Sequence, residues 1–595
     1  MTKPEEFQVK LADPQELATT WMRIFTNGLD ALQSTAKKHT GKKTALPYDP
    51  LAPMRAVSDL TATVLANPTQ MFSAQQKFFK EWSDLWTTTA ARAFGEKREP
   101  VIAPERSDRR FNEAGWNELP PFDYLKQAYL LASRQILETV ASSELDPPAR
   151  IRADFYARQF INALSPANFA FTNPEAIRKA FETGGVSLLS GYANLLADAA
   201  SPSGLVKRRA EDNFELGVNI AATPGSIIFQ NEMMQLIQYI PTTETVYKRP
   251  IMYVPPLVNK YYILDLQPKS SLIKWLVDQG HTVFVISWVN PGQSLAYKGM
   301  WDYLRQGPIA ALDAIELATG ETTVDCFAFC MGGVLLSMTA GYLAATKQGN
   351  RMGTVTVIGT LLDTTHSGEW SAFYEKSHFE AFETHLDEAG VMDADKLQAL
   401  FSVVRSNDLI WSSVVNHYLM DRVAPASDLL FWFADGAHIP KAFLLEYARA
   451  MIRENLLHQP GGVVINGTPI DLGKVKVPVT VISLKDDHVS AWQATYDGAK
   501  LFGGKSRFVL GGSGHNAGLV NPPAANKHGY WVNDELPETP QEWFDGAKKH
   551  EGSWWPNWQQ WLVANNGGAK VPARAPGTGK LPVIEAAPGS YVRMQ

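Results

Sequence analysis

The stretch that decides the fold is Val324-Asp325-Cys326-Phe327-Ala328-Phe329-Cys330-Met331-Gly332-Gly333, an apolar run that ends in a cysteine and a pair of glycines. A helix-forming sequence follows it directly. This order predicts a strand, a sharp turn and a helix, which together raise the residue at the turn above the edge of a sheet. That residue is Cys330, and a thiol suits acyl transfer because a thiolate is a strong nucleophile and also leaves readily from a thioester.

Short apolar segments alternate with helical ones from about residue 248 onward. The expected strands are Ile251–Val254, Thr282–Trp288, Val324–Phe329, Thr354–Ile358, Val479–Leu484 and Arg507–Leu510. Such alternation predicts an α/β protein with a mostly parallel sheet and helices on both faces. Combined with the turn at Cys330, it predicts an α/β-hydrolase fold.

Two later strands deliver the partners that a nucleophile in this fold requires, an acid and then a histidine. The strand Val479–Leu484 runs into Asp487, and the strand Arg507–Leu510 opens into a glycine-rich loop that contains His515. Glycines there leave room to present one imidazole. We therefore predict a catalytic triad of Cys330, Asp487 and His515.

Each member of this triad has a plainer explanation that must be weighed. A cysteine in an apolar strand is usually a small buried hydrophobe, which is our interpretation of Cys326. An aspartate after a strand is often a turn former, and Asp486 is the obvious competitor of Asp487. His488 is interpreted as structural. Three residues in the correct chain order, each at the end of an expected strand, favour the catalytic interpretation.

The chain is long enough for two domains or more. Residues 1–200 are dominated by helical periodicity and are predicted to form a mainly helical amino-terminal domain, whereas residues 201–595 are predicted to form the catalytic domain. An aromatic-rich insertion at about 363–473 is expected to form a cap, since insertions at this position gate entry and exclude water.

One helical face of the amino-terminal part carries large apolar side chains. They are Met71, Phe72, Phe78, Phe79, Trp82, Leu85 and Trp86. Helical spacing of this kind indicates packing against the rest of the protein, which is the favoured interpretation. Contact with a hydrophobic polymer surface or a partner protein is the alternative.

Composition sets further limits. The 595 residues carry a net charge of −6, so no overall basic field favours nucleic acid. The two cysteines lie four positions apart without zinc-ligand spacing, so neither a disulfide framework nor a metal site is expected. Residues 1–6 lack the pattern of a secretory signal, and no apolar run is long enough to span a bilayer. We expect a cytoplasmic protein.

The sequence resembles the class I polyhydroxyalkanoate synthases, which include the poly-3-hydroxybutyrate synthases. The similarity covers about residues 99–561 and rests on a set of segments. They are Pro104–Phe111, Asp123–Gln127, Pro241–Val246, Pro255–Tyr262, Ser287–Gly292, Gly514–Gly518, Asn521–Pro523 and Gly552–Trp555.

Two positions depart from the family pattern. The family usually has Gly-x-Cys-x-Gly-Gly at the turn, and this chain has Ala328 in place of the first glycine. We expect a slightly altered turn that still functions. The family also typically shows Trp-Asn-x-Asp, where this chain has Trp432-Phe433-Ala434-Asp435. This change is expected to affect hydrogen bonding in the cap and the preferred monomer length.

The resemblance implies polymerisation of 3-hydroxyacyl-coenzyme A thioesters through an acyl-cysteine, with coenzyme A as a product and no cofactor. His515 would take the thiol proton while the Cys330 sulfur attacks the thioester carbonyl. The oxyanion requires two donors, for which the backbone N–H groups of Met331 and Val258 are the candidates. The prolines before Val258 have no N–H to give.

Several alternatives remain open from sequence. Asp487 either orients His515 or acts more directly on the 3-hydroxyl group of the substrate. An acyl thioesterase would use the same triad, and a catalytically silent granule-associated protein is the rival outside enzymes. The resemblance further implies a homodimer, preference for short-chain monomers, and association with polymer granules and their coat proteins.

Overall fold

The structure is a computed structural model that describes residues 13–40, 47–106, 108–201, 213–366, 368–423 and 425–595. Residues 1–6, on which the expectation about a secretory signal rests, lie outside the described residues, as does Ser107 of the first family segment. The chain divides into two compact units. The first, which we call the helical unit, comprises residues 1–211, 371–382 and 398–425; the second, the α/β unit, comprises residues 212–370, 383–397 and 426–595.

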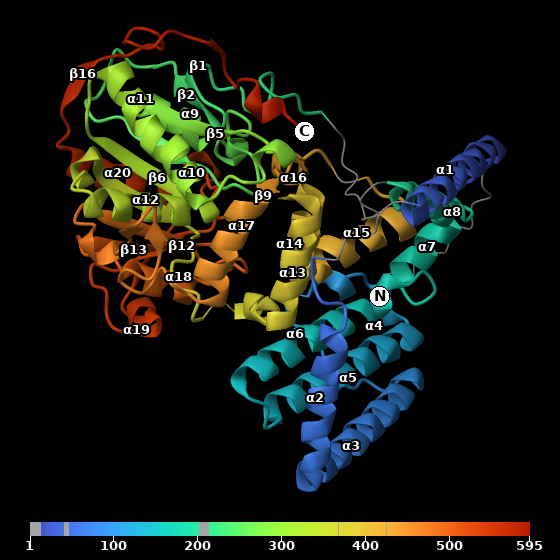
Figure 1. The fold of residues 1–595 in the computed structure, drawn as a ribbon. Helices are drawn as coiled ribbons and strands as arrows, with labels where there is room; N and C mark the ends of the chain where they lie inside the picture. The colour runs from blue at the N-terminus through green and yellow to red at the C-terminus, as the bar shows by residue number, and fades with distance from the viewer. Residues whose placement is uncertain (1–12, 41–46, 107, 202–212, 367, 424) are drawn as a thin grey trace. The chain divides into compact units, whose positions relative to one another are not determined.

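An 11-stranded sheet forms the centre of the α/β unit (Figure 1). In spatial order the strands are β15 (Lys548–His550), β14 (Tyr530–Val532), β13 (Ser506–Gly511), β12 (Val479–Leu484), β7 (Met352–Ile358), β6 (Val324–Phe329), β4 (Ile251–Val254), β5 (Val283–Trp288), β2 (Met234–Tyr239), β1 (Gly225–Gln230) and β17 (Glu585–Ala586). The run from β13 to β5 is parallel throughout. These six strands are the ones predicted from sequence, and the predicted α/β-hydrolase fold is confirmed.

The remaining strands of this sheet pair in the antiparallel sense and were not predicted. Strands β2, β1 and β17 extend the sheet beyond β5, and β14 and β15 extend it beyond β13. The sheet therefore has a parallel centre with antiparallel strands on both sides. The carboxyl ends of the central strands meet at one edge, where sites in such sheets form.

The α/β unit also contains helices, several of which pack on the sheet. They are α9 (Leu272–Asp278), α10 (Met300–Leu304), α11 (Ala310–Thr319), α12 (Met331–Ala345), α16 (Asp428–Ala434), α17 (Lys441–Tyr447), α18 (Trp492–Ala499), α19 (Pro540–Asp545) and α20 (Trp555–Asn566). Helix α12 packs against β6 and β7. Helices α9 and α20 bury side chains in one core with the strands.

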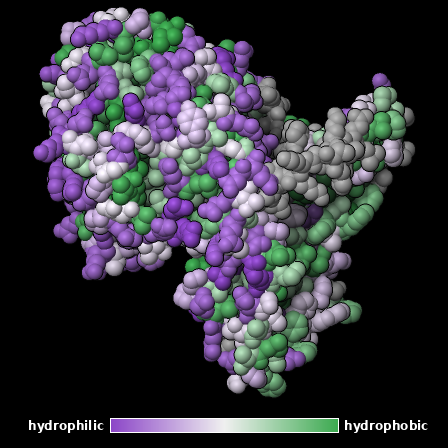
Figure 2. Space-filling view, in the orientation of Figure 1, coloured by the Kyte–Doolittle hydropathy of each residue, from purple (hydrophilic) through white to green (hydrophobic). Residues whose placement is uncertain are grey.

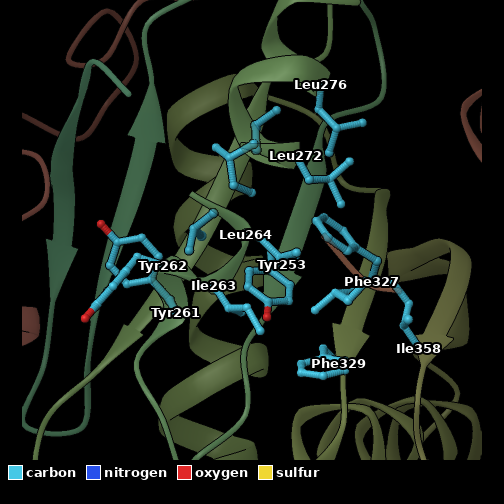
Figure 3. Packing of buried hydrophobic residues seen from close by; sticks show 14 of the residues in the cluster. Tyr253, Tyr261, Tyr262, Ile263, Leu264, Leu272, Leu276, Phe327, Phe329 and Ile358 are labelled. Atoms are coloured by element: carbon cyan, nitrogen blue, oxygen red, sulfur yellow. The ribbon is translucent and has the colours of Figure 1, made fainter. Parts of the chain in front are cut away.

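This core explains why β6 is mostly apolar, with Asp325 as the exception. Figure 3 shows Tyr253 and Phe327 beneath Leu272 and Leu276 of α9. The rings of Tyr253 and Phe327 stack with centroids 4.9 Å apart. Cys326, between the inward-facing residues of β6, points to the opposite face because strand side chains alternate, and it is also buried. A strand covered on both faces reads as a continuous apolar run.

The helical unit contains α1 (Pro14–Thr40), α2 (Ala52–Ala66), α3 (Pro68–Ala93), α4 (Gly115–Glu118), α5 (Pro120–Ser142), α6 (Pro147–Ala163), α7 (Pro174–Glu182) and α8 (Val186–Ala200). Helix α1 packs along α8, and α3 packs along α5. Several helices begin at proline, which suits the first turn because the missing N–H has no partner there.

The insertion between β7 and β12 contributes to both units. It holds α13 (Lys376–Ala389), α14 (Ala394–Val404), α15 (Ser412–Val414), α16 and α17. Its segments 371–382 and 398–425 group with the helical unit. Three two-stranded sheets complete the α/β unit: β8 (Val391–Met392) with β9 (Ile439–Pro440), β10 (Val464–Ile465) with β11 (Thr468–Pro469), and β3 (Thr245–Tyr247) with β16 (Lys570–Pro572).

The apolar face of α3 is divided between the core and the surface. Leu85 is buried and Trp82 packs beside it against α5. Phe72, Phe79 and Trp86 are each more than 60% exposed, so packing within the unit accounts for only part of this face. Figure 2 shows hydrophobic surface over the α2–α3 part of the helical unit. Among the described residues, none of the helices combines the length and apolarity needed to cross a bilayer.

Candidate active site

Cys330 occupies a strained turn between β6 and α12. Its φ of 53° and ψ of −128° lie outside the regions that non-glycine residues usually adopt. The glycines at 332 and 333 let the start of α12 pass close to neighbouring segments of the chain. A Cβ atom on Gly332 would lie 2.5 Å from the carbonyl oxygens of Val254 and Pro255, so only glycine fits there. Strain of this kind persists where the surrounding structure fixes it, typically at functional sites.

Neighbouring strands hold this turn in place. The Cys330 N–H donates to the carbonyl of Ile358 at 2.9 Å, at the end of β7. The Thr360 hydroxyl donates to the carbonyl of Cys330 at 3.1 Å. Cys330 itself is half-buried, whereas Cys326 is fully buried. The turn therefore presents the Cys330 side chain at the carboxyl edge of the sheet and keeps it accessible.

Asp487 and His515 meet in a buried pair. Nδ1 of His515 donates to Oδ2 of Asp487 at 2.6 Å, and the Asp487 side chain is fully buried. Oδ1 of Asp487 accepts the backbone N–H groups of Val489 and Ser490, at 2.7 and 2.8 Å. Both oxygens of this carboxylate are thus engaged, which fixes the orientation of the His515 ring.

Charge and burial act in opposite directions on His515. Burial opposes the charged ring, but the Asp487 carboxylate and the Cys330 side chain outweigh it and raise the pKa of His515 to about 10. Hydrogen bonding of the ring to the Cys330 side chain also raises the pKa of His515. The imidazole therefore interacts with both the acid and the thiol, and these two groups favour a proton on the ring.

Close packing orients the imidazole further. The Phe329 ring lies with its centroid 4.6 Å from that of His515. A Cβ atom on Gly359 would lie 3.1 Å from Cε1 of His515, so this glycine makes room for the ring. Gly359 is itself held by the Ser490 hydroxyl, which donates to its carbonyl at 2.9 Å.

The structure separates the predicted residues from their competitors. Asp486 is exposed, whereas Asp487 is buried against His515. Cys326 lies inside β6, where burial raises its thiol pKa well above the ordinary value. His488 lies in the loop after β12, next to Asp487. Thr360 and Ser490 were not singled out from sequence, because their role depends on strands that approach only in the folded sheet.

The two candidate oxyanion donors lie at the ends of neighbouring strands. Met331 is the first residue of α12, and Val258 follows β4 by four residues. Strands β4 and β6 pair directly, with Val254 opposite Ala328. The carbonyl of Val258 accepts the N–H of Ala437 at 3.0 Å. The assignment of their N–H groups as oxyanion donors stays a prediction.

The two departures from the family pattern occupy apolar surroundings. Ala328 is fully buried in β6, between Val254 of β4 and Val357 of β7. Phe433 lies in α16 and packs against the main core of the α/β unit. The phenyl ring of Phe433 therefore lies in apolar surroundings. The expected effects of Ala328 on the turn and of Phe433 on monomer preference stay predictions.

Comparisons with known proteins agree on the family. Residues 107–276 match the family model "Poly-beta-hydroxybutyrate polymerase (PhaC) N-terminus", and residues 259–522 match "alpha/beta hydrolase fold". The chain is 42% identical to the poly(3-hydroxyalkanoate) polymerase of Methylorubrum extorquens, over 91% of this chain and 90% of that protein. It is 39% identical to the poly(3-hydroxyalkanoate) polymerase subunit PhaC of Cupriavidus necator, over 90% of each chain. A Rhizobium meliloti protein of the same name is 39% identical over 98% of this chain and 96% of its own length. The resemblance noted in the sequence is thereby confirmed, and the chain belongs to the poly(3-hydroxyalkanoate) polymerase family of enzymes.

Proposed function

We propose that this chain polymerises short-chain 3-hydroxyacyl-coenzyme A thioesters, with 3-hydroxybutyryl-coenzyme A as the preferred monomer, into a polyester and releases coenzyme A. The observation that carries the proposal is the buried Asp487–His515 pair, at 2.6 Å, whose imidazole also contacts the Cys330 side chain at a strained turn. The names of its relatives support the polymer as the product.

Acylation begins with transfer of the Cys330 thiol proton to Nε2 of His515. The sulfur attacks the thioester carbonyl, a new C–S bond forms, and the bond between the carbonyl and the sulfur of coenzyme A breaks. The proton held by His515 passes to the departing thiolate, which leaves as free coenzyme A. The high pKa of His515 supports this role because the ring retains the proton while the tetrahedral intermediate forms.

Elongation uses the same groups in a second transfer. The 3-hydroxyl of another unit loses its proton to His515 and attacks the acyl-Cys330 carbonyl, so an ester C–O bond forms and the C–S bond breaks. The Cys330 sulfur recovers the proton. Asp487 orients His515 in this scheme and does not act on the hydroxyl, because Val489, Ser490 and His515 occupy its oxygens and its side chain is fully buried.

The developing oxyanion requires donors placed before the reaction starts. We assign this role to the backbone N–H groups of Met331 and Val258. The N–H of Met331 belongs to the first turn of α12, where N–H groups have no partner within the helix and the helix dipole favours negative charge.

The proposal extends to assembly and location. We infer a homodimer that works in the cytoplasm at the surface of polymer granules, together with granule-coat proteins. No resident cofactor takes part, since coenzyme A enters as part of the substrate and leaves as a product.

The test compares the variants Cys330→Ala and Cys326→Ala in an assay with 3-hydroxybutyryl-coenzyme A as the substrate. We expect Cys330→Ala to release no coenzyme A and to form no chloroform-soluble polymer, whereas Cys326→Ala retains both activities. Mass spectrometry of the wild-type protein should show an acyl group on the peptide that contains Cys330. Release of free 3-hydroxy acid in place of polymer would identify a thioesterase, and polymer formation by Cys330→Ala would refute the mechanism.

A further inference from the structure

The loop that carries Val258 pairs with the segment after α16. The N–H of Ala437 donates to the carbonyl of Val258 at 3.0 Å, and Asn259 and Gly436 form an isolated antiparallel bridge. Two residues on, Nε1 of Trp432 donates to the carbonyl of Lys260 at 2.7 Å. Residues 432–437 therefore hold the carbonyl groups of Val258 and Lys260.

Asp435 adds a side-chain anchor to this pairing. Its Oδ1 forms an ion pair of 2.6 Å with Nζ of Lys260, and its Oδ2 accepts the hydroxyl of Tyr262 at 2.7 Å. The side chains of Lys260 and Asp435 are only 6% and 15% exposed. In Figure 3 the rings of Tyr261 and Tyr262 point away from Phe327 and Phe329, although all four residues belong to the same buried core.

The position of Asp435 is not explained by the stability of its own helix. It directly follows α16, whose last residue is Ala434. The carboxyl end of a helix carries partial negative charge and favours cations, so a carboxylate gains nothing there. Its favourable contacts are those with Lys260 and Tyr262, which follow Val258 by two and four residues.

We propose that Asp435 is a positioning residue that fixes the backbone N–H of Val258 for oxyanion stabilisation. This inference rests on the proposed function. Pro255 and Pro256 restrict the backbone before Val258, and the contacts of residues 258, 260 and 262 restrict it afterwards. Without Asp435 only the second restriction is weakened, so the donor loses its fixed direction while Cys330, His515 and Asp487 stay in place.

The experiment compares two reactions of the same sulfur in the full-length protein. Acylation by 3-hydroxybutyryl-coenzyme A passes through an oxyanion, whereas alkylation of Cys330 by iodoacetamide does not. In Asp435→Asn we expect the single-turnover release of coenzyme A to slow by roughly 10- to 100-fold. We expect the alkylation rate and the KM to stay within about threefold of the wild type, because the lost interaction belongs to the transition state.

Asp428→Asn is the matched control. Asp428 lies at the start of the same helix. Its carboxylate accepts hydrogen bonds from the side chains of Gln267 and Ser270, which lie outside the loop at Val258. We expect it to acylate at the wild-type rate. If Asp435→Asn folds poorly, the double variant Lys260→Met/Asp435→Leu takes its place. It removes both members of the ion pair, so neither charge is left buried without its partner. It should show the same slow acylation with normal alkylation.

Three outcomes would overturn the inference. Wild-type acylation by Asp435→Asn, or by the double variant where the single variant cannot be purified, would show that the anchor is not needed. Parallel loss of acylation and alkylation would indicate a general structural role. An equal loss in Asp428→Asn would show that α16, not its carboxylate at residue 435, matters. Failure of the proposed function is separate, since it appears as coenzyme A release by Cys330→Ala.

Discussion

Gly333 and Thr360 approach so closely that a Cβ atom placed on Gly333 would lie 2.0 Å from Oγ1 of Thr360. The same hydroxyl donates to the carbonyl of Cys330, so this approach is part of what holds the turn. Substituting Gly333→Ala must displace either Thr360 or the first turn of α12. We expect the free energy of unfolding to fall by about 1 to 3 kcal/mol, as overpacking does, and activity to be lost.

Gly349→Ala provides the control for this variant in denaturant unfolding and coenzyme A release. A Cβ atom there would meet its nearest neighbour, an atom of Ala344, at 3.5 Å, which is ordinary contact. It should behave as the wild type. Full activity in Gly333→Ala would contradict the view that the turn depends on this contact.

Asp487→Asn tests whether the carboxylate only orients His515. Because its oxygens are occupied by Val489, Ser490 and His515, we expect acylation and elongation to fall together, by roughly a hundredfold or more. Single-turnover release of coenzyme A and the rate of polymer growth report the two steps. Selective loss of elongation would instead support direct action of Asp487 on the hydroxyl.

The same pair predicts a dependence of stability on alkaline pH. The pKa of His515 in the folded protein is about 10, above the ordinary histidine value of 6.5. A group whose pKa is raised on folding stabilises the protein fully below its unfolded pKa and loses that contribution as the pH rises to the folded pKa. Unfolding measured between pH 6.5 and 10 should show this decline in the wild type and a smaller one in Asp487→Asn.

His281 predicts the opposite behaviour in acid. Both ring nitrogens are buried and have no hydrogen-bond partner among the residues that the structure describes. Burial, aided by the charge of Lys570, lowers the pKa of His281 to about 4. The unfolded chain takes up a proton below about pH 6.5, but the folded protein does not until about pH 4. Stability should therefore fall across this window, by up to about 3 kcal/mol. His281→Phe should flatten the curve, and an unchanged slope would contradict the assignment.

Two positions on α3 should respond very differently to truncation. Leu85 is fully buried, so Leu85→Ala should lower the free energy of unfolding by about 2 to 5 kcal/mol. Phe79 is 62% exposed, so Phe79→Ala should change it by less than about 1 kcal/mol. Chemical denaturation of the two variants measures the difference. A large loss in Phe79→Ala would indicate that this part of the face is covered in solution.

Ala328→Gly restores the residue that the family usually has at this position. Ala328 is buried within β6, two residues before the strained turn. Removal of its methyl group and the greater freedom of glycine should together cost about 1 to 2 kcal/mol of stability. We expect coenzyme A release to change by less than about twofold. A large gain in activity would show that the methyl group distorts the turn.

The parallel part of the sheet could be predicted because its strands are continuous apolar runs next to helical segments. The flanking strands could not. In β2 the polar residues Gln235 and Gln238 interrupt the apolar run, yet both are buried. Gln235 donates to Ser590 at 3.0 Å and Gln238 to the carbonyl of Arg574 at 3.0 Å. Their burial depends on carboxyl-terminal segments more than 300 residues away, which local patterns do not contain.

The site shows the same division. Chain order at the ends of strands was sufficient to select Cys330, Asp487 and His515 as candidates. Asp486 also follows β12, and the structure distinguishes the two because only Asp487 is buried against His515. Thr360 and Ser490 had no local signal, because each acts through a contact with a distant segment. Asp435 was visible only as part of a family motif, and its contact with Lys260 could not be read from that motif.

The unequal burial of the chain's two sulfur atoms makes the protein its own reporter. Only Cys330 is accessible in the native state, so one equivalent of a chromogenic thiol reagent should count the competent turns in a preparation. Cys326 becomes available only when β6 separates from its neighbours. Its delayed modification would therefore time the opening of the sheet, without any added probe.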